Sequence, residues 1–172
     1  MVMKRILRFI VFFIIAGLAI THFYTNTQSA KGGKPITLDD TGCLGLNYHR
    51  VYDDTFTNKA IEWLTHSQEL TDYNVYKSEF KEQIDFLIEH DAQFLTEAQV
   101  VKTLKTGSTF PDRCVWISFD DIEQSVYTNA FPILKEHNIP FSIYVLTAQV
   151  GKNYQNLQMA SWEQLQEMQQ SG

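Results

Sequence analysis

The sequence has 172 residues, of which 44% are hydrophobic and 13% aromatic, so it can form the packed core of one domain and is unlike disordered chains. The net charge is −6, and no basic patch points to a nucleic-acid partner. Two cysteines are too few for a disulfide-rich scaffold or a zinc site built from cysteines alone.

The first thirty residues have the order of an export signal. Three basic residues, Lys4, Arg5 and Arg8, precede the twelve apolar residues 9–20. Twelve residues fall short of the ~20 that span a bilayer as a helix, and extension to Tyr24 gives sixteen. We therefore expect residues 1–30 to be a signal peptide or signal anchor and the protein to be secreted or held at the cell surface by residues 6–24. A buried helix of a soluble protein is the alternative, and residues 31–41 are predicted to be a linker.

From residue 42 onward, stretches typical of strands alternate with stretches typical of helices. Strands are predicted at 43–51, 92–95, 114–119 and 141–146, and helices at 61–70, 78–91, 96–106, 126–137 and 162–170. The alternation predicts an α/β fold with parallel β/α units. A closed barrel needs about eight strands and ~250 residues, and this sequence ends on a helix. We therefore expect 42–172 to be a partial domain whose C-terminal part is missing.

Several local signals refine these helices. Ser78 is the expected N-cap of helix 78–91, whose apolar face carries Phe80, Ile84, Leu87 and Ile88. Capping boxes pair Thr96 with Gln99 and Ser161 with Gln164, and Gly107 is expected to end a helix. Pro132 must either kink helix 126–137 or stand in the first turn of a second helix. Asp53 and Asp54 are predicted to be solvated loop residues.

The most informative stretch is Val115-Trp116-Ile117-Ser118-Phe119, which leads directly into Asp120 and Asp121. Ligands bind at the carboxyl ends of parallel strands, where one carboxylate can hold a cation while the other accepts a proton from water. Taken alone, the pair is equally well explained as two solvated residues of a turn, with Asp121 helping to cap the next helix. Both cysteines, Cys43 and Cys114, stand at predicted strand starts. Export would permit a disulfide between them, but we favour buried free thiols.

Three motifs give the sequence a family resemblance. They are Leu46-Asn47-Tyr48-His49-Arg50-Val51, Trp116-Ile117-Ser118-Phe119-Asp120-Asp121 and Ala130-Phe131-Pro132-Ile133-Leu134-Lys135. In this order they closely resemble the intercellular-adhesion poly-β-1,6-N-acetylglucosamine N-deacetylases of biofilms, a branch of the NodB-type polysaccharide deacetylases. The resemblance extends from about Thr41 to Gly172.

The resemblance implies the N-terminal part of a distorted parallel (β/α) barrel that works outside the membrane. It also implies that Asp120 is the catalytic base, Asp121 a metal ligand and His49 the general acid. The metal is a divalent ion, with zinc expected, held by two histidines and one Asp. Most family members have Gly where this chain has Ile122. The two metal-binding histidines of the family belong to a segment expected after residue 172, so the chain as given is expected to be inactive.

These residue types suit the hydrolysis of an acetamide. A carboxylate can take the proton of water, and an imidazolium can protonate the leaving amine. The product polymer gains positive charge, and residues 31–172 carry 11 basic against 20 acidic residues, which suits a cationic product. We expect a monomer that acts on poly-N-acetylglucosamine at the cell surface or membrane, with no nucleic-acid partner. The alternatives are a non-catalytic glycan-binding fragment and a receiver-like domain that binds magnesium.

Overall fold

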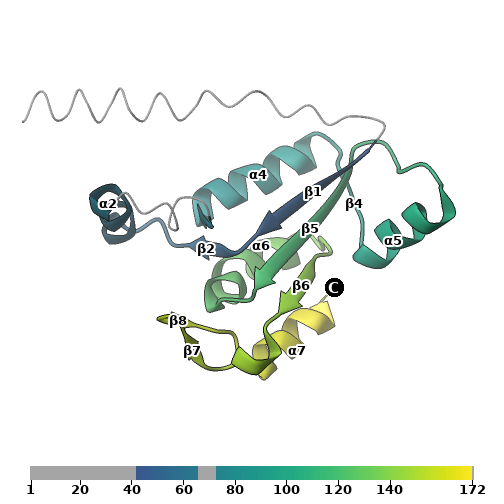
Figure 1. Cartoon of the computed structure of the whole chain (residues 1–172). Helices are drawn as coiled ribbons and strands as arrows, with labels where there is room; N and C mark the ends of the chain where they lie inside the picture. The colour runs from purple at the N-terminus through teal and green to yellow at the C-terminus, as the bar shows by residue number, and fades with distance from the viewer. Residues whose placement is uncertain (1–41, 66–72, 172) are drawn as a thin grey trace, which may run out of the picture. The chain divides into compact units, whose positions relative to one another are not determined.

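The computed structural model describes residues 42–65 and 73–171. The main sheet has four parallel strands, β1 (Cys43–Tyr48), β4 (Gln93–Phe94), β5 (Cys114–Asp121) and β6 (Ser142–Val145) (Figure 1). All four correspond to strands predicted from the sequence, and the α/β class is confirmed. The predicted signal or anchor and the linker lie outside the described residues. Within the described ranges, no helix has the length and apolar character needed to cross a membrane.

Strand β5 is the centre of this sheet, because β1, β4 and β6 all pair with it. Strand β1 follows one edge of β5 from Cys43 opposite Cys114 to Tyr48 opposite Phe119. The other edge is shared, since β4 pairs with the first two residues of β5 and β6 with the last four. The described strands therefore form an open sheet in which β4 and β6 pair with different parts of the same edge of β5. Closure of the sheet into a barrel stays a prediction.

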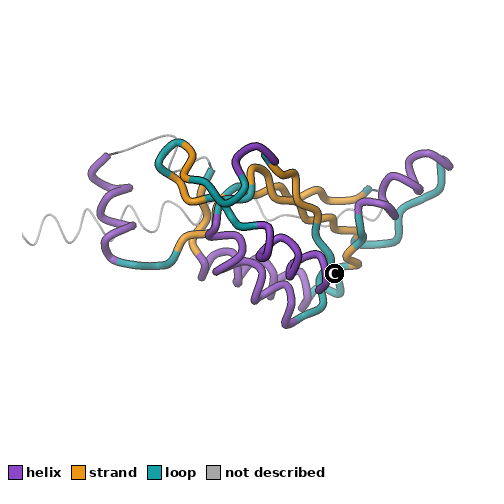
Figure 2. The backbone as a smooth tube through the Cα atoms, turned by 90° about the horizontal axis from the view of Figure 1, so that it is seen from below, coloured by secondary structure: helices purple, strands orange, loops and turns teal. Residues whose placement is uncertain are grey.

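The two faces of β5 differ in chemistry because successive side chains of a strand point to opposite sides. Val115, Ile117 and Phe119 are fully buried on one face. They pack against α4 (Lys77–Glu89), the π-helical turn η1 (Val126–Ala130) and α6 (Phe131–Glu136), which lie on one side of the strands (Figure 2). Trp116 and Ser118 lie on the other face, which carries the polar groups described below.

Helix starts follow the local signals in most places. The capping boxes at Thr96 and Ser161 are present and begin α5 (Glu97–Thr106) and α7 (Trp162–Ser171). Gly107 ends α5 in the left-handed conformation, and Pro132 stands in the first turn of α6. The prediction for Ser78 was wrong, because α4 begins at Lys77 with Tyr76 as its N-cap. The Ser78 backbone N–H and hydroxyl donate to Asp54 instead, so Asp54 is not simply a solvated loop residue.

Short elements complete the fold. They are α2 (Phe56–Thr65), which begins before the predicted helix 61–70, the parallel pair β2 (Arg50–Tyr52) and β3 (Asn74–Tyr76), η2 (Thr147–Gln149), and the hairpin β7 (Asn153–Tyr154) with β8 (Leu157–Gln158). Helix α5 has no buried residue, and its Leu104 is 65% exposed. Ile88, which was expected on the buried face of α4, is 37% exposed.

The two cysteines form a disulfide, so the expectation of buried free thiols was wrong. The β1–β5 register places Cys43 directly opposite Cys114, with a Cα–Cα separation of 4.5 Å. Two cysteines at such neighbouring positions lie within the range of separations that disulfides span. The residue pattern showed that both stand at strand starts, but only the pairing of the strands shows that they are neighbours.

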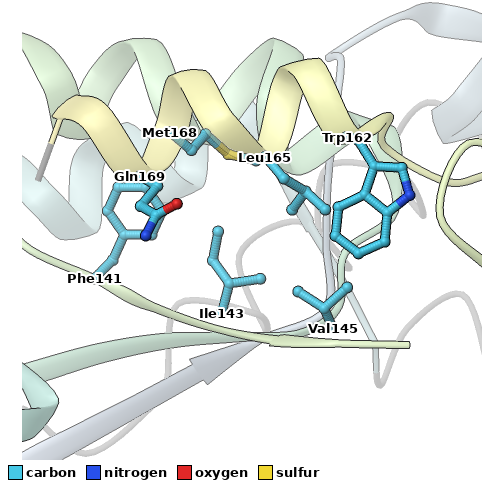
Figure 3. A pocket seen from close by; sticks show the side chains of 7 residues that line it. All are labelled: Phe141, Ile143, Val145, Trp162, Leu165, Met168 and Gln169. Carbon is cyan, nitrogen blue, oxygen red and sulfur yellow. The ribbon is translucent and has the colours of Figure 1, made fainter. Parts of the chain in front are cut away.

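An apolar pocket of about 330 Å³ lies between β6 and α7 (Figure 3). It is lined by Phe141, Ile143, Val145, Trp162, Leu165, Met168 and Gln169. The β6 residues in this lining alternate with Ser142 and Tyr144, which lie on the opposite face beside Ser118 and Asp120. The pocket therefore belongs to the helix-covered side of the sheet, and the convergent polar groups lie on the other side.

Candidate active site

The Asp pair is held at the end of β5 by a turn with unusual backbone geometry. Asp121 and Ile122 both have positive φ, 64° and 62°. The Ile122 N–H donates to the carbonyl of Asp120 at 2.7 Å, and the Ile122 carbonyl accepts from Ala160 at 3.1 Å. Left-handed geometry is unfavourable for a β-branched residue. Here the Ile122 side chain is fully buried in the core, so packing holds the turn in place.

Asp120 is held by a side chain from the neighbouring strand. Asn47 Nδ2 donates to Asp120 Oδ2 at 2.9 Å, and the Ser118 hydroxyl donates to Asn47 Oδ1 at 2.9 Å. The Asp120 side chain remains 35% exposed. It is therefore oriented by the sheet and still open to a substrate, which is what a general base requires.

His49 lies beside Asp120. It stands between β1 and β2, and its Nε2 is 3.8 Å from Oδ2 of Asp120. That separation is too long for a direct hydrogen bond, but it places the two polar groups side by side. The imidazole also packs edge-on against the ring of Tyr73, with centroids 4.8 Å apart. The structure thus brings together an imidazole and a carboxylate from positions 71 residues apart in the sequence.

Asp121 is exposed at the end of β5, next to Asp120 but not hydrogen-bonded to it. A metal ion needs more donors than one carboxylate, and catalytic zinc ordinarily has three protein ligands. Among the described residues, no group of three or more His, Cys, Asp or Glu is placed to hold a metal. These residues therefore do not make a complete metal site, and Asp121 fits only the role of a single anionic ligand.

Two further residues of this face were not singled out from the sequence. Asn47 occupies an exposed position of β1, where a polar residue is ordinary. Its place two residues before His49 was the sequence signal that the two side chains share a face.

Tyr144 lies opposite Asp120 in the β5–β6 register, and its hydroxyl donates to Glu97 at 3.4 Å. Partial burial, with the nearby carboxylates of Glu97 and Asp120, raises the pKa of Tyr144, so its hydroxyl stays protonated and able to donate.

Comparison with known proteins agrees with the family resemblance seen in the motifs. Residues 107–172, which contain the Asp pair, match the sequence model of the family described as polysaccharide deacetylase. The chain is 41% identical over 150 residues to a poly-β-1,6-N-acetyl-D-glucosamine N-deacetylase of Staphylococcus epidermidis. That alignment covers 87% of this chain and 52% of the relative. The chain therefore spans about half the length of the curated relatives it matches.

Solved structures show the same likeness. IcaB from Ammonifex degensii superposes with a TM-score of 0.64 at 33% identity, covering 80% of this chain and 52% of that one. The deacetylase PplD of Streptococcus pyogenes, solved with acetate, gives a TM-score of 0.61 at 22% identity, over 78% of this chain and 54% of that one. At that identity the second likeness concerns the fold alone. The resemblance predicted from the three motifs is thus confirmed.

Proposed function

We propose that this chain takes part in the N-deacetylation of extracellular poly-N-acetylglucosamine, a hydrolysis that releases acetate during the maturation of a biofilm polysaccharide. The observation that carries the proposal is the His49–Asp120 pair, an acid and a base 3.8 Å apart on a partly exposed sheet face. The likeness to the staphylococcal N-deacetylase supports the choice of substrate. The chain spans about half of that relative, so N-deacetylase activity is proposed for this chain and not inferred from the relative alone.

In this proposal Asp120 accepts a proton from the water that attacks the acetyl carbonyl. A C–O bond forms, and His49 then donates a proton to the amide nitrogen as the C–N bond breaks. The products are acetate and a free amine on the sugar. The 3.8 Å between Nε2 and Oδ2 suits these roles, because the attacking oxygen and the leaving nitrogen are bonded to the same carbon.

A divalent cation, with zinc as the expected ion, is part of the proposal. When bound, such an ion lowers the pKa of water and polarises a carbonyl. Asp121 would provide one ligand, since its exposed carboxylate adjoins the base at the end of β5. The described residues do not complete the site.

The proposed place of action is outside the cytoplasm, either free or anchored through residues 6–24. Two features support it: the basic-then-apolar order of the first thirty residues and the Cys43–Cys114 disulfide, which is typical of oxidising compartments. Alkaline phosphatase, which folds only outside the reducing cytoplasm, can be fused after Gly172 as a reporter. We expect the fusion to be active, and a fusion that is produced intact but inactive would refute export.

Acetate release from poly-N-acetylglucosamine tests the function directly. The parent protein for this test is a completed form that also carries the two metal-binding histidines expected from the family resemblance, because the 172-residue chain alone is expected to release no acetate. We expect the completed parent to release acetate, and both Asp120→Asn and Asp121→Asn to abolish the release. Asp112→Asn is the matched control, because Asp112 is exposed in the loop before β5. If the parent binds the polymer without releasing acetate, the glycan-binding alternative is correct. If Asp120→Asn retains the parental rate, the assignment of the base is wrong.

A further inference from the structure

The Asn47 side chain bridges two residues of the neighbouring strand. Its Nδ2 is 2.9 Å from Oδ2 of Asp120, and its Oδ1 is 2.9 Å from Oγ of Ser118. The register places Asn47 directly opposite Ser118, and Asp120 follows two residues later on the same face. One amide therefore connects two successive positions on this face of β5, the central strand of the sheet (Figure 1).

Chemistry allows one direction for these hydrogen bonds. An ionised carboxylate only accepts, so Asn47 must turn its NH₂ group toward Asp120. Its carbonyl oxygen then faces Ser118, whose hydroxyl has to donate. Ser118 is 3% exposed, so solvent offers its hydroxyl little alternative to this partner. Ser118 thus selects which end of the Asn47 amide faces the carboxylate.

We propose that Asn47 is a positioning residue, that its amide fixes the carboxylate of Asp120, and that Ser118 sets the direction of that amide. The inference rests on the proposed function, in which Asp120 is the base. Among the described residues, the polar contacts of this carboxylate fall on Oδ2, from Asn47 and His49. Oδ1 is therefore the oxygen that remains to receive the proton of water.

Kinetics of the completed parent protein, the form used for acetate release, separate this role from a merely structural one. Asn47→Ala removes a hydrogen bond to a charged group, so we expect kcat to fall about 10- to 100-fold. KM should stay unchanged, because Asn47 acts through Asp120 and not on the substrate. Asn47→Asp keeps the shape but replaces the donor by a second carboxylate, and we expect it to lose at least as much kcat as Asn47→Ala. Parental kcat in either variant would overturn the proposal.

A double-mutant cycle tests the role of Ser118. Alone, Ser118→Ala should lower kcat about 2- to 10-fold, because it removes a hydrogen bond between neutral groups and lets the amide rotate. In the Asn47→Ala background it should have no further effect on kcat, since the amide it orients is gone. Independent, additive losses in kcat would contradict the arrangement. Asn58→Asp is the matched control for Asn47→Asp. Asn58 also donates through its side-chain amide, but to the backbone carbonyl of Asp53 in a loop, away from Asp120.

Nuclear magnetic resonance provides a measurement that does not need activity. The side-chain NH₂ resonances of Asn47 in the ¹⁵N-labelled chain should shift in Asp120→Ala and stay in place in Asp85→Ala, where a carboxylate paired with Lys81 is removed. Unmoved Asn47 resonances in Asp120→Ala would overturn the positioning role even in an active enzyme. A parent protein without activity whose Asn47 resonances respond as expected would contradict the proposed function and leave the positioning contact supported.

Discussion

The left-handed turn after the Asp pair predicts that alanine loses its usual advantage over glycine at position 122. Ile122 has a φ of 62° and a fully buried side chain. Replacing it by Ala removes most of its packing, at a cost of about 2–5 kcal/mol, and Gly removes one more buried methyl group, worth about 0.8 kcal/mol. The two variants differ in this methyl group and in backbone terms. Ala pays about 1–2 kcal/mol for the left-handed conformation and regains about 0.4–1 kcal/mol through the entropy of the unfolded chain.

The strain of Ala is offset by its methyl group and by chain entropy, so we expect Ile122→Ala and Ile122→Gly to be equally stable within about 1 kcal/mol. Ile84 is the matched control, because it is also fully buried but lies inside α4. There Ala should be more stable than Gly by about 2 kcal/mol, because helix propensity and the buried methyl group both favour Ala. The difference between the two comparisons is then about 2 kcal/mol, which is well above the error of a mutational series.

Equilibrium urea unfolding of the four variants, followed by tryptophan fluorescence, measures these free energies. The m-values must agree within each pair, so that the comparison concerns stability and not a changed denatured state. The reasoning is refuted if Ala is more stable than Gly by the same margin at both positions, because the backbone at position 122 would then not be left-handed in solution.

Three further predictions concern the disulfide, a buried tyrosine and the site. Reduction of Cys43–Cys114 should lower the free energy of unfolding by up to about 4 kcal/mol, because the bridge joins residues 71 apart; melting curves that coincide with and without reductant, with both thiols shown to be free, would contradict this. Burial raises the pKa of Tyr48 to about 12. The unfolded chain therefore loses the phenolic proton at lower pH than the folded chain, and the free energy of unfolding should fall as the pH rises from about 10 to 12. Tyr48→Phe should make the free energy of unfolding less dependent on pH over this range. In the completed parent protein, His49→Ala should reduce turnover and leave zinc affinity unchanged in calorimetry, whereas Asp121→Asn should weaken zinc affinity. Loss of zinc binding in His49→Ala would show that His49 is a ligand.

The elements that the sequence predicted are those with a repeated local signal. Strand β5 follows from five consecutive strand-forming residues, and α5 and α7 from capping boxes that need only residues three apart. Strands β2 and β3 have three residues each, too few for any periodicity to be visible. Their pairing brings Arg50 opposite Asn74, and nothing near either residue indicates the other.

The site was predictable as a set of residues but not as an arrangement. Asp120 and His49 were found through their motifs, and the structure places them side by side. The contribution of Asn47 depends on the register of β1 against β5, which the sequence does not reveal. The disulfide was missed for the same reason. Local preference argues against a left-handed Ile122, and only the burial of its side chain in the core explains why the chain adopts it.

The central place of β5 has a consequence for how the chain is made. Strands β1 and β4 have their pairing partner in residues 114–121, which are synthesised later than either of them. Until that segment has been synthesised, the apolar side chains of β1 have no strand to join, and Cys43 has no cysteine to react with. A growing chain must therefore keep the segment from β1 to β4 from aggregating. Folding of this chain should therefore depend on chaperones that keep an unfolded chain soluble, and on thiol oxidation that takes place after Cys114 has been synthesised.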